Sequence, residues 1–230
     1  MTAEQAQFVS TPEKGEVPAV LIQPAGARAM LAFAHGAGAG IHHPFMRATA
    51  ERLAARGVAT LRYQFPYMQL GRRPPDRPSV LIDTVRAAAA RAGALSAGLP
   101  LFAGGKSLGG RMTSMADARA PLSDVRGLVF FGFPLHPPKR PSTERAAHLA
   151  EVHVPMLFLQ GTRDVLADLD LLDPIVADLG SRAVLHLVQG ADHGFEVLKR
   201  SGRTSEQVLD ELADAVSTWI EEVLSARETS

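Results

Sequence analysis

Short apolar runs alternate with longer segments that have one apolar face along most of this chain of 230 residues. Short runs bounded by turn residues are typical of buried strands, and longer periodic segments are typical of helices. The expected strands are 17–22, 29–34, 58–63, 101–103, 128–131, 156–159 and 183–188. The expected helices are 44–56, 79–95, 111–119, 169–179 and 205–224. This alternation predicts an α/β fold with a mostly parallel central sheet and helices on both faces.

Turn and cap residues set the expected boundaries of these elements. The sequence Gln-Pro-Ala-Gly at 23–26 separates the first two apolar runs, and this predicts that the runs form an opening hairpin. Pro44 begins the first helix and Gly57 follows its end, in agreement with helix start and stop chemistry. Ser79 is the expected N-cap of the second helix.

One motif indicates chemistry. The apolar run at 101–103 leads into Gly105-x-Ser107-x-Gly109, and a helix-compatible segment follows. In a nucleophile elbow, a serine sits on a strained turn between strand and helix, with glycines two positions before and after it. Ser107 is therefore the candidate nucleophile. Two other interpretations exist: a plain strand-to-helix turn, and a phosphate-binding loop, which Pro100 excludes because that loop needs glycine there.

A serine nucleophile needs a general base and an acid that orients it. His193 follows the last expected strand in a glycine-flanked loop, and Asp164 follows the strand before it. The order Ser, Asp, His is that of α/β-hydrolases. Asp168 is close enough in sequence to compete with Asp164, and Asp192 is expected to accept only local backbone hydrogen bonds.

A second glycine-rich loop, 33–40, follows an early strand and is typical of an oxyanion loop. The expected donors to the developing oxyanion are the backbone N–H groups of Ala37 and Leu108. A dinucleotide-binding fingerprint fails here in both registers, because Ile41 or His43 stands where the third glycine should be.

Composition limits the function classes. The length and 46% hydrophobic content fit one domain over residues 1–230. The 24 basic and 24 acidic residues give no net charge, so neither nucleic acid nor a membrane is an expected partner. Cysteine is absent. The first seven residues have neither a basic n-region nor an apolar core, and no apolar run approaches about 18 residues, so neither a signal peptide nor a membrane span is expected. We expect a soluble cytoplasmic protein that needs no cofactor or metal.

Two proline-rich segments follow expected strand ends, where ligands bind in open α/β sheets. One is 66–78, with Arg72, Arg73 and Arg77; the other is 134–141, with His136, Lys139 and Arg140. They are expected either to wall a pocket that prefers an anionic substrate or to be solvated basic loops.

The motifs together resemble a known family. Gly105 to Arg111, His35 to Gly38, Phe65 to Met68, Phe133 to Pro138, Gly161 to Asp164 and Ala191 to His193 are similar to small α/β-hydrolases of the dienelactone-hydrolase-like group. More narrowly, they resemble the family that includes the hydrolase-like domain of a regulatory subunit of the NSL chromatin complex. The resemblance implies an α/β-hydrolase fold with little or no lid and a Ser107, Asp164, His193 triad. Further candidates for substrate binding are His35, Gly36, Tyr67, His136 and Arg111.

One departure limits this resemblance: dienelactone hydrolases use a cysteine nucleophile, so their lactone substrate does not carry over to Ser107. We expect a serine hydrolase that acts on a small acyl substrate, an ester or thioester, as a monomer or small homo-oligomer. The rival hypothesis is a scaffold or binding protein that kept the fold and lost catalysis. Peptide cleavage is a third hypothesis, but the two proline-rich segments are short for the subsites that it needs.

Overall fold

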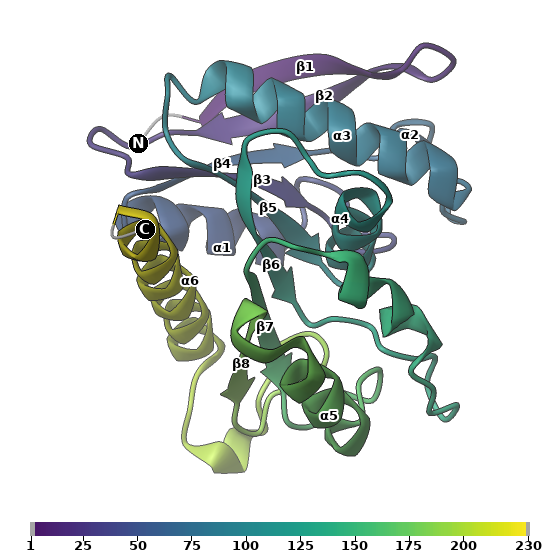
Figure 1. Ribbon diagram of the computed structural model, residues 1–230, viewed down its shortest axis with the longest axis vertical. Helices are drawn as coiled ribbons and strands as arrows, with labels where there is room; N and C mark the ends of the chain where they lie inside the picture. The colour runs from purple at the N-terminus through teal and green to yellow at the C-terminus, as the bar shows by residue number, and fades with distance from the viewer. Residues whose placement is uncertain (1–2, 229–230) are drawn as a thin grey trace.

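Eight strands form one sheet in the computed structural model, which describes residues 3–228 (Figure 1). The strands are β1 (Ala3–Thr11), β2 (Gly15–Ile22), β3 (Ala29–Ala34), β4 (Val58–Tyr63), β5 (Leu101–Lys106), β6 (Val125–Phe131), β7 (Met156–Gly161) and β8 (Ala183–Val188). Their order is β1-β2-β4-β3-β5-β6-β7-β8. β2 runs antiparallel to β1 and to β4, and every other neighbouring pair is parallel. The predicted mostly parallel sheet is confirmed.

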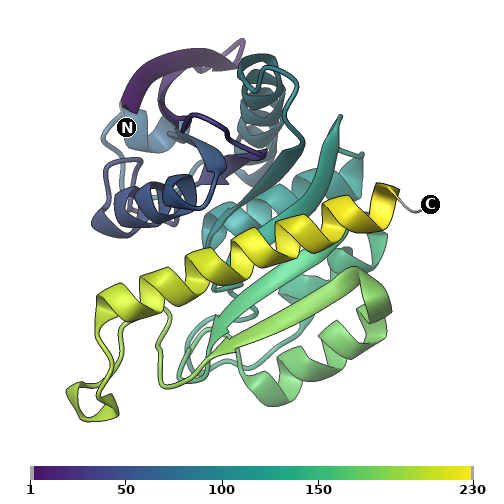
Figure 2. The same cartoon turned by 90° about the vertical axis from the view of Figure 1, so that its left-hand side faces the viewer.

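Helices cover both faces of this sheet (Figures 1 and 2). The core of one face includes residues of α1 (Pro44–Ala55) and α6 (Ser205–Glu228), and α6 crosses the sheet diagonally. The other face is covered by α3 (Pro78–Leu95), α4 (Leu108–Arg119) and α5 (Leu169–Leu179). The remaining helical segments are α2 (Pro66–Gln69), η1 (Glu144–Glu151), η2 (Gly180–Arg182) and η3 (Lys199–Ser201).

The two-residue period of the strands divides the core between these layers. In β6, Phe130 packs edge-on against Phe158 on the α4 side, with ring centroids 4.8 Å apart. Its neighbour Phe131 packs against Phe33 on the α1 side, at 5.1 Å. All four rings are fully buried, and each is worth about 1.5–3 kcal/mol of burial. β6 is therefore held from both sides, which fixes the strand ends where the candidate site lies.

The predicted opening hairpin is wrong in its partners. β2 pairs with β1 and β4, whereas β3 pairs in parallel with β4 and β5. The hairpin is formed instead by β1 and β2, and Gly15 at φ 69° lies at its turn. The apolar pattern does not predict β1, because this strand is polar and only Phe8 and Ser10 in it are buried. An edge strand of this kind is held mainly by backbone hydrogen bonds to its neighbour, and a search for apolar runs does not detect such bonds.

The predicted N-cap of α3 is also wrong. α3 begins at Pro78, with Arg77 in the cap position and no side-chain cap hydrogen bond. Proline at the first helical position has the backbone angle of a helix and no N–H to satisfy. Ser79 therefore lies inside the first turn instead of capping it.

Little covers the carboxyl edge of the parallel strands. The connection from β4 to α3 contains only the four-residue α2, and the connection from β6 to β7 contains the eight-residue η1. This agrees with the predicted small or absent lid. Among residues 3–228, no helix is long and apolar enough to cross a membrane.

Candidate active site

Ser107 occupies a strained turn between β5 and α4. Its backbone angles are φ 50° and ψ −116°, an unfavourable region for a residue with a side chain that costs about 1–3 kcal/mol. The turn is tight because β5 and α4 both press against the end of β3. A Cβ atom at Gly105 would lie 2.5 Å from the Ala34 carbonyl oxygen, and one at Gly109 would lie 2.7 Å from Ala34 Cβ. The glycines are therefore sterically required.

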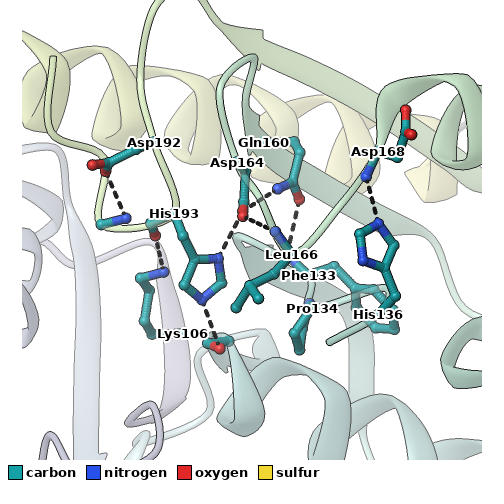
Figure 3. A network of polar contacts seen from close by, with 12 residues as sticks. Lys106, Phe133, Pro134, His136, Gln160, Asp164, Leu166, Asp168, Asp192 and His193 are labelled. Carbon is teal, nitrogen blue, oxygen red and sulfur yellow. Dashed lines mark hydrogen bonds and ion pairs between the residues drawn. The ribbon is translucent and has the colours of Figure 1, made fainter. Parts of the chain in front are cut away.

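Three side chains from three strand ends form a continuous hydrogen-bonded series. His193 Nε2 lies 2.9 Å from Ser107 Oγ, and His193 Nδ1 lies 2.7 Å from Asp164 Oδ2. Figure 3 shows the imidazole of His193 directed at the Asp164 carboxylate. Placing the ring proton on Nδ1 lets it donate to Asp164 and leaves Nε2 to accept the serine proton. The structure thus brings together the three residues that the sequence selected.

The Asp164 carboxylate is completely buried and fully hydrogen-bonded. Gln160 Nε2 donates to Oδ2 at 2.5 Å, and the backbone N–H of Leu166 donates to Oδ1 at 2.8 Å. Gln160 is held in turn, because its Oε1 accepts from the backbone N–H of Phe133 at 3.0 Å (Figure 3). A buried carboxylate needs such donors to offset its lost hydration. Sequence reasoning missed Gln160, whose only signal is its place on β7 four residues before Asp164.

Asp168, the competing candidate, and Asp192, beside His193, have other tasks. Asp168 caps α5, where its Oδ1 accepts from the N–H of Asp170 at 3.1 Å. Asp192 accepts from the N–H groups of Gly194 and Glu196, at 2.8 and 3.0 Å. Both contacts are local, so Asp164 alone of the three meets His193.

The oxyanion loop lies against the nucleophile. A Cβ atom at Gly36 would sit 3.6 Å from Ser107 Cβ, which places the backbone of this loop beside the serine. Ala37 is exposed, and Leu108 is the first residue of α4. Neither N–H donates to any acceptor among residues 3–228. The unused donors therefore belong to the residue after Gly36 and to the residue after Ser107, and their role as an oxyanion hole stays a prediction.

The side chains of His35 and Tyr67 hold this loop, and their assignment as substrate-binding residues stays a prediction. Both are fully buried. His35 Nε2 accepts from the N–H of Phe65 at 3.1 Å, and Nδ1 lies 2.7 Å from the Gly36 carbonyl oxygen. The Tyr67 hydroxyl accepts from the N–H of Gly38 at 3.2 Å. Their polar atoms are thus engaged within the protein.

His136 is also held within the protein, and its role in substrate binding likewise stays a prediction. It is 4% exposed, Nε2 accepts from the N–H of Asp168 at 3.0 Å, and Nδ1 lies 2.9 Å from the Pro137 carbonyl oxygen (Figure 3). It therefore ties the loop after β6 to the loop after β7. Arg111, the remaining candidate, is half-buried on the first turn of α4.

Lys106 fixes the loop that carries the catalytic histidine candidate. Its Nζ donates to the carbonyl oxygen of His193 (Figure 3). The ammonium also lies over the rings of Phe45 and Phe195, 5.7 and 5.1 Å from their centroids. Burial lowers the pKa of Lys106 to about 8, although the carboxylates of Asp164 and Asp192 act to raise it. No local pattern indicates this contact, because its two residues are 87 positions apart.

The buried His35 makes acid sensitivity an expected property. Burial lowers the pKa of His35 to about 4, so the unfolded chain takes up a proton below pH 6.5 that the folded chain takes up only near pH 4. The contribution of neutral His35 to the free energy of unfolding is therefore fully present above about pH 6.5. It is lost as the pH falls toward 4, and the loss from this residue is about 3 kcal/mol at most. Denaturant unfolding of the parent and His35→Gln at pH 7 and 4.5 checks this. The destabilisation by the substitution should be smaller at pH 4.5, and a constant difference would contradict the assignment.

Within the described range 3–228, no three His, Asp or Glu side chains gather in a way that could hold a metal ion.

Comparison with known proteins agrees with this fold. The family model described as "Alpha/beta hydrolase domain" matches residues 27–221. A dienelactone hydrolase from Anabaena variabilis is 23% identical, with a TM-score of 0.74 over 96% of this chain and 99% of that chain. An alpha-beta serine hydrolase homologue from Coxiella burnetii is 18% identical, with a TM-score of 0.74 over 94% and 98% of the two chains.

A Xanthomonas campestris protein described as an α/β serine hydrolase without a lid is 19% identical, with a TM-score of 0.70 over 95% of this chain and 96% of that chain. At these identities the three structures show a shared fold. The family model covers most of the chain, including the segments that carry Ser107, Asp164 and His193. The chain belongs to the α/β hydrolase domain family.

Proposed function

We propose that this protein is a serine hydrolase that cleaves an ester or thioester of a small acyl group. One observation carries the proposal: Ser107, His193 and Asp164 form a hydrogen-bonded series with distances of 2.9 and 2.7 Å. Nucleophile, base and orienting acid within such reach are the geometric signature of an activated serine. Ser107 is also partly accessible, so a substrate can reach it.

Acylation follows from the positions of these groups. His193 Nε2 takes the proton from Ser107 Oγ as the oxygen attacks the acyl carbonyl carbon. The negative charge that develops on the carbonyl oxygen is accepted by the N–H groups of Leu108 and Ala37. Donors of this kind are worth about 2.7–4 kcal/mol each in the transition state. Asp164 keeps the proton of the imidazole on Nδ1 and stabilises the imidazolium.

Release of the leaving group and hydrolysis reverse these roles. The imidazolium of His193 donates its Nε2 proton to the alkoxide or thiolate as the carbon–oxygen or carbon–sulfur bond breaks. Water then attacks the acyl-enzyme while Nε2 accepts its proton. As the tetrahedral intermediate collapses and the bond from the acyl carbon to Ser107 Oγ breaks, the imidazolium returns that proton to Oγ, which frees the acid and restores Ser107. Every step uses side chains or backbone groups of this chain.

The choice of an ester or thioester rests on the small cover over the site. Peptide cleavage needs subsites for the chain on both sides of the scissile bond, and the segments around α2 and η1 are short. The structural neighbours named as a serine hydrolase homologue and as esterases are consistent with acyl transfer to water. The narrower link to the NSL-complex subunit stays a prediction from the motifs, as do cytoplasmic location and a monomeric or small homo-oligomeric state.

Labelling with a fluorophosphonate probe tests the proposal. Purified protein is incubated with the probe and measured by intact-mass spectrometry, beside Ser107→Ala and His193→Ala. We expect one label per chain in the parent and none in either variant, because phosphonylation needs the nucleophile and its base. A folded parent that takes no label would contradict the proposal and favour a catalytically silent scaffold. Labelling that persists in Ser107→Ala would place the nucleophile elsewhere.

A further inference from the structure

Two arginines near the nucleophile lack a carboxylate partner. None of the ion pairs found among residues 3–228 includes Arg111 or Arg145. Arg111 makes no hydrogen bond through its guanidinium to any described residue. Arg145 donates only to the carbonyl oxygen of Pro134, at 3.5 Å. Both side chains are half-buried, where an unpaired charge is costly.

Arg111 lies one helical turn from the reactive serine. Its backbone N–H donates to the Ser107 carbonyl oxygen at 3.1 Å, so the two residues share a face of the helix start. Side chains in a helix lean toward its N-terminus, which directs Arg111 back toward the Ser107 end of α4.

Arg145 reaches the same region from η1. Its acceptor, Pro134, directly follows Phe133, whose N–H is bound by Gln160 beside Asp164 (Figure 3). α4 and η1 pack together, and Ser114 Oγ of α4 lies 2.7 Å from His148 Nε2 of η1. The two arginines are thus carried by packed elements that both border the candidate site.

The charges in this cluster are of one sign. Burial lowers the pKa of Arg111, and the neighbouring charge of Arg145 lowers it further. Burial also lowers the pKa of His148 to about 4, with a further contribution from Arg111, so this imidazole is neutral at pH 7 and adds no further positive charge. The neighbouring Glu144 and Glu151 are exposed and form no ion pair with either arginine. The cluster lacks an anion.

The basic loop after β4 differs on this point. Arg72 is bound to Asp76 at 2.8 Å, and Lys14 lies 3.4 Å from the same carboxylate oxygen. Asp76 is nearly buried, with a side-chain exposure of 6%. The charge of Arg72 is therefore satisfied inside the protein, and Arg72 is a poor candidate for substrate recognition.

We propose that Arg111 and Arg145 form an anion subsite that binds a carboxylate on the acyl substrate, so that the preferred substrate is an anionic ester or thioester. This inference rests on the proposed serine hydrolase function. Guanidinium groups suit a carboxylate because their planar N–H donors match its two oxygens. A dicarboxylate monoester or a carboxylate-bearing leaving group would present the required charge at a distance from the scissile bond.

Matched ester pairs test the subsite and locate the charge. For the acyl side, 4-nitrophenyl hemiglutarate is compared with 4-nitrophenyl pentanoate, a neutral ester of equal chain length. For the leaving-group side, 4-acetoxybenzoate is compared with its methyl ester, by release of acetate. We expect the parent to prefer the anionic member of one pair, and that pair identifies the half of the ester that carries the charge. No preference in either pair would overturn the subsite.

Substitutions then assign the preference to the two arginines. Arg111→Gln and Arg145→Gln should each raise KM for the preferred anionic ester by about 10- to 100-fold, the range of a lost charge-assisted hydrogen bond. KM and kcat for its neutral partner should change by less than about twofold. Arg119→Gln, an exposed arginine at the other end of α4, is the matched control and should change neither. Equal losses on neutral and anionic esters would refute the assignment.

A binding measurement separates failure of the subsite from failure of the proposed function. Glutarate binding is measured by calorimetry on the parent and Arg111→Gln, beside fluorophosphonate labelling of both. Labelling of both proteins without glutarate binding or anionic preference overturns only the subsite. Absence of labelling in the parent overturns the hydrolase. In that case, glutarate binding that is lost in Arg111→Gln still supports an anion site at this cluster, and its absence refutes it.

Discussion

Replacement of Asp164 by asparagine is expected to lower kcat for a small neutral ester by about 10³- to 10⁴-fold. The carboxylate accepts hydrogen bonds from Gln160, Leu166 and His193. In either orientation of the asparagine amide, its NH₂ group would face at least one of these donors, and that hydrogen bond would be lost. The neutral side chain also cannot stabilise the imidazolium that forms when His193 takes the serine proton. The measurement is steady-state hydrolysis of 4-nitrophenyl acetate, with circular dichroism to verify the fold.

Asp168→Asn is the matched control for this substitution. Asp168 is the N-cap of α5 and does not touch His193. Asparagine caps a helix about as well as aspartate, so stability and turnover should stay within about twofold of the parent. Retention of more than a tenth of the activity in Asp164→Asn would contradict its role as the orienting acid. Equal losses in the two variants would mean that the β7 loop as a whole, and not one carboxylate, is required.

Elements with local signals were predictable from the sequence. The strands at 58–63 and 183–188 and the helix at 169–179 have the expected bounds, because apolar runs with flanking turn or cap residues define them locally. β1 was not predictable in this way, since it buries only two side chains and depends on pairing with β2. α3 begins at Pro78 and not after Ser79, because the fixed backbone angle of proline favours the first helical position more than Ser79 favours the cap position.

In the candidate site, too, residues with a local sequence motif were predictable, and residues that act through contacts distant in sequence were not. Ser107 was identifiable because its motif encodes a steric demand, and Asp164 and His193 were identifiable because parallel strands bring their ends to one edge. The residues that hold these three side chains in place were not identifiable from the sequence. Lys106 meets the His193 carbonyl oxygen, and His35 meets the N–H of Phe65, through contacts that only the folded chain creates. The glycine-rich motif around His35 therefore indicates a substrate ligand, whereas the folded chain also uses this buried side chain to support the loop.

Replacement of Gly105 by alanine should destabilise the fold by about 3 kcal/mol or more and abolish most activity. The added Cβ would lie 2.5 Å from the Ala34 carbonyl oxygen, 2.8 Å from Ala34 Cβ and 2.9 Å from the Gly109 carbonyl carbon. All three atoms belong to backbone or to a Cβ, so no flexible side chain can move aside. β5 must shift away from β3, and Ser107 moves with it out of reach of His193. Urea unfolding and ester hydrolysis measure the two effects.

Gly93→Ala is the control for this steric argument, because it makes the same chemical change with the opposite expected sign. Gly93 lies inside α3, and an added Cβ would meet only Leu101 Cδ2, at an ordinary contact distance of 3.6 Å. Alanine in a helix interior is favoured over glycine by about 0.5–1 kcal/mol, so this variant should unfold at a higher urea concentration and keep full activity. If Gly105→Ala were as stable and active as Gly93→Ala, close contact between β5 and β3 could not be what requires glycine at the elbow. Loss of both properties in Gly105→Ala alone would tie the strained turn of Ser107 directly to the packing of the sheet beneath it.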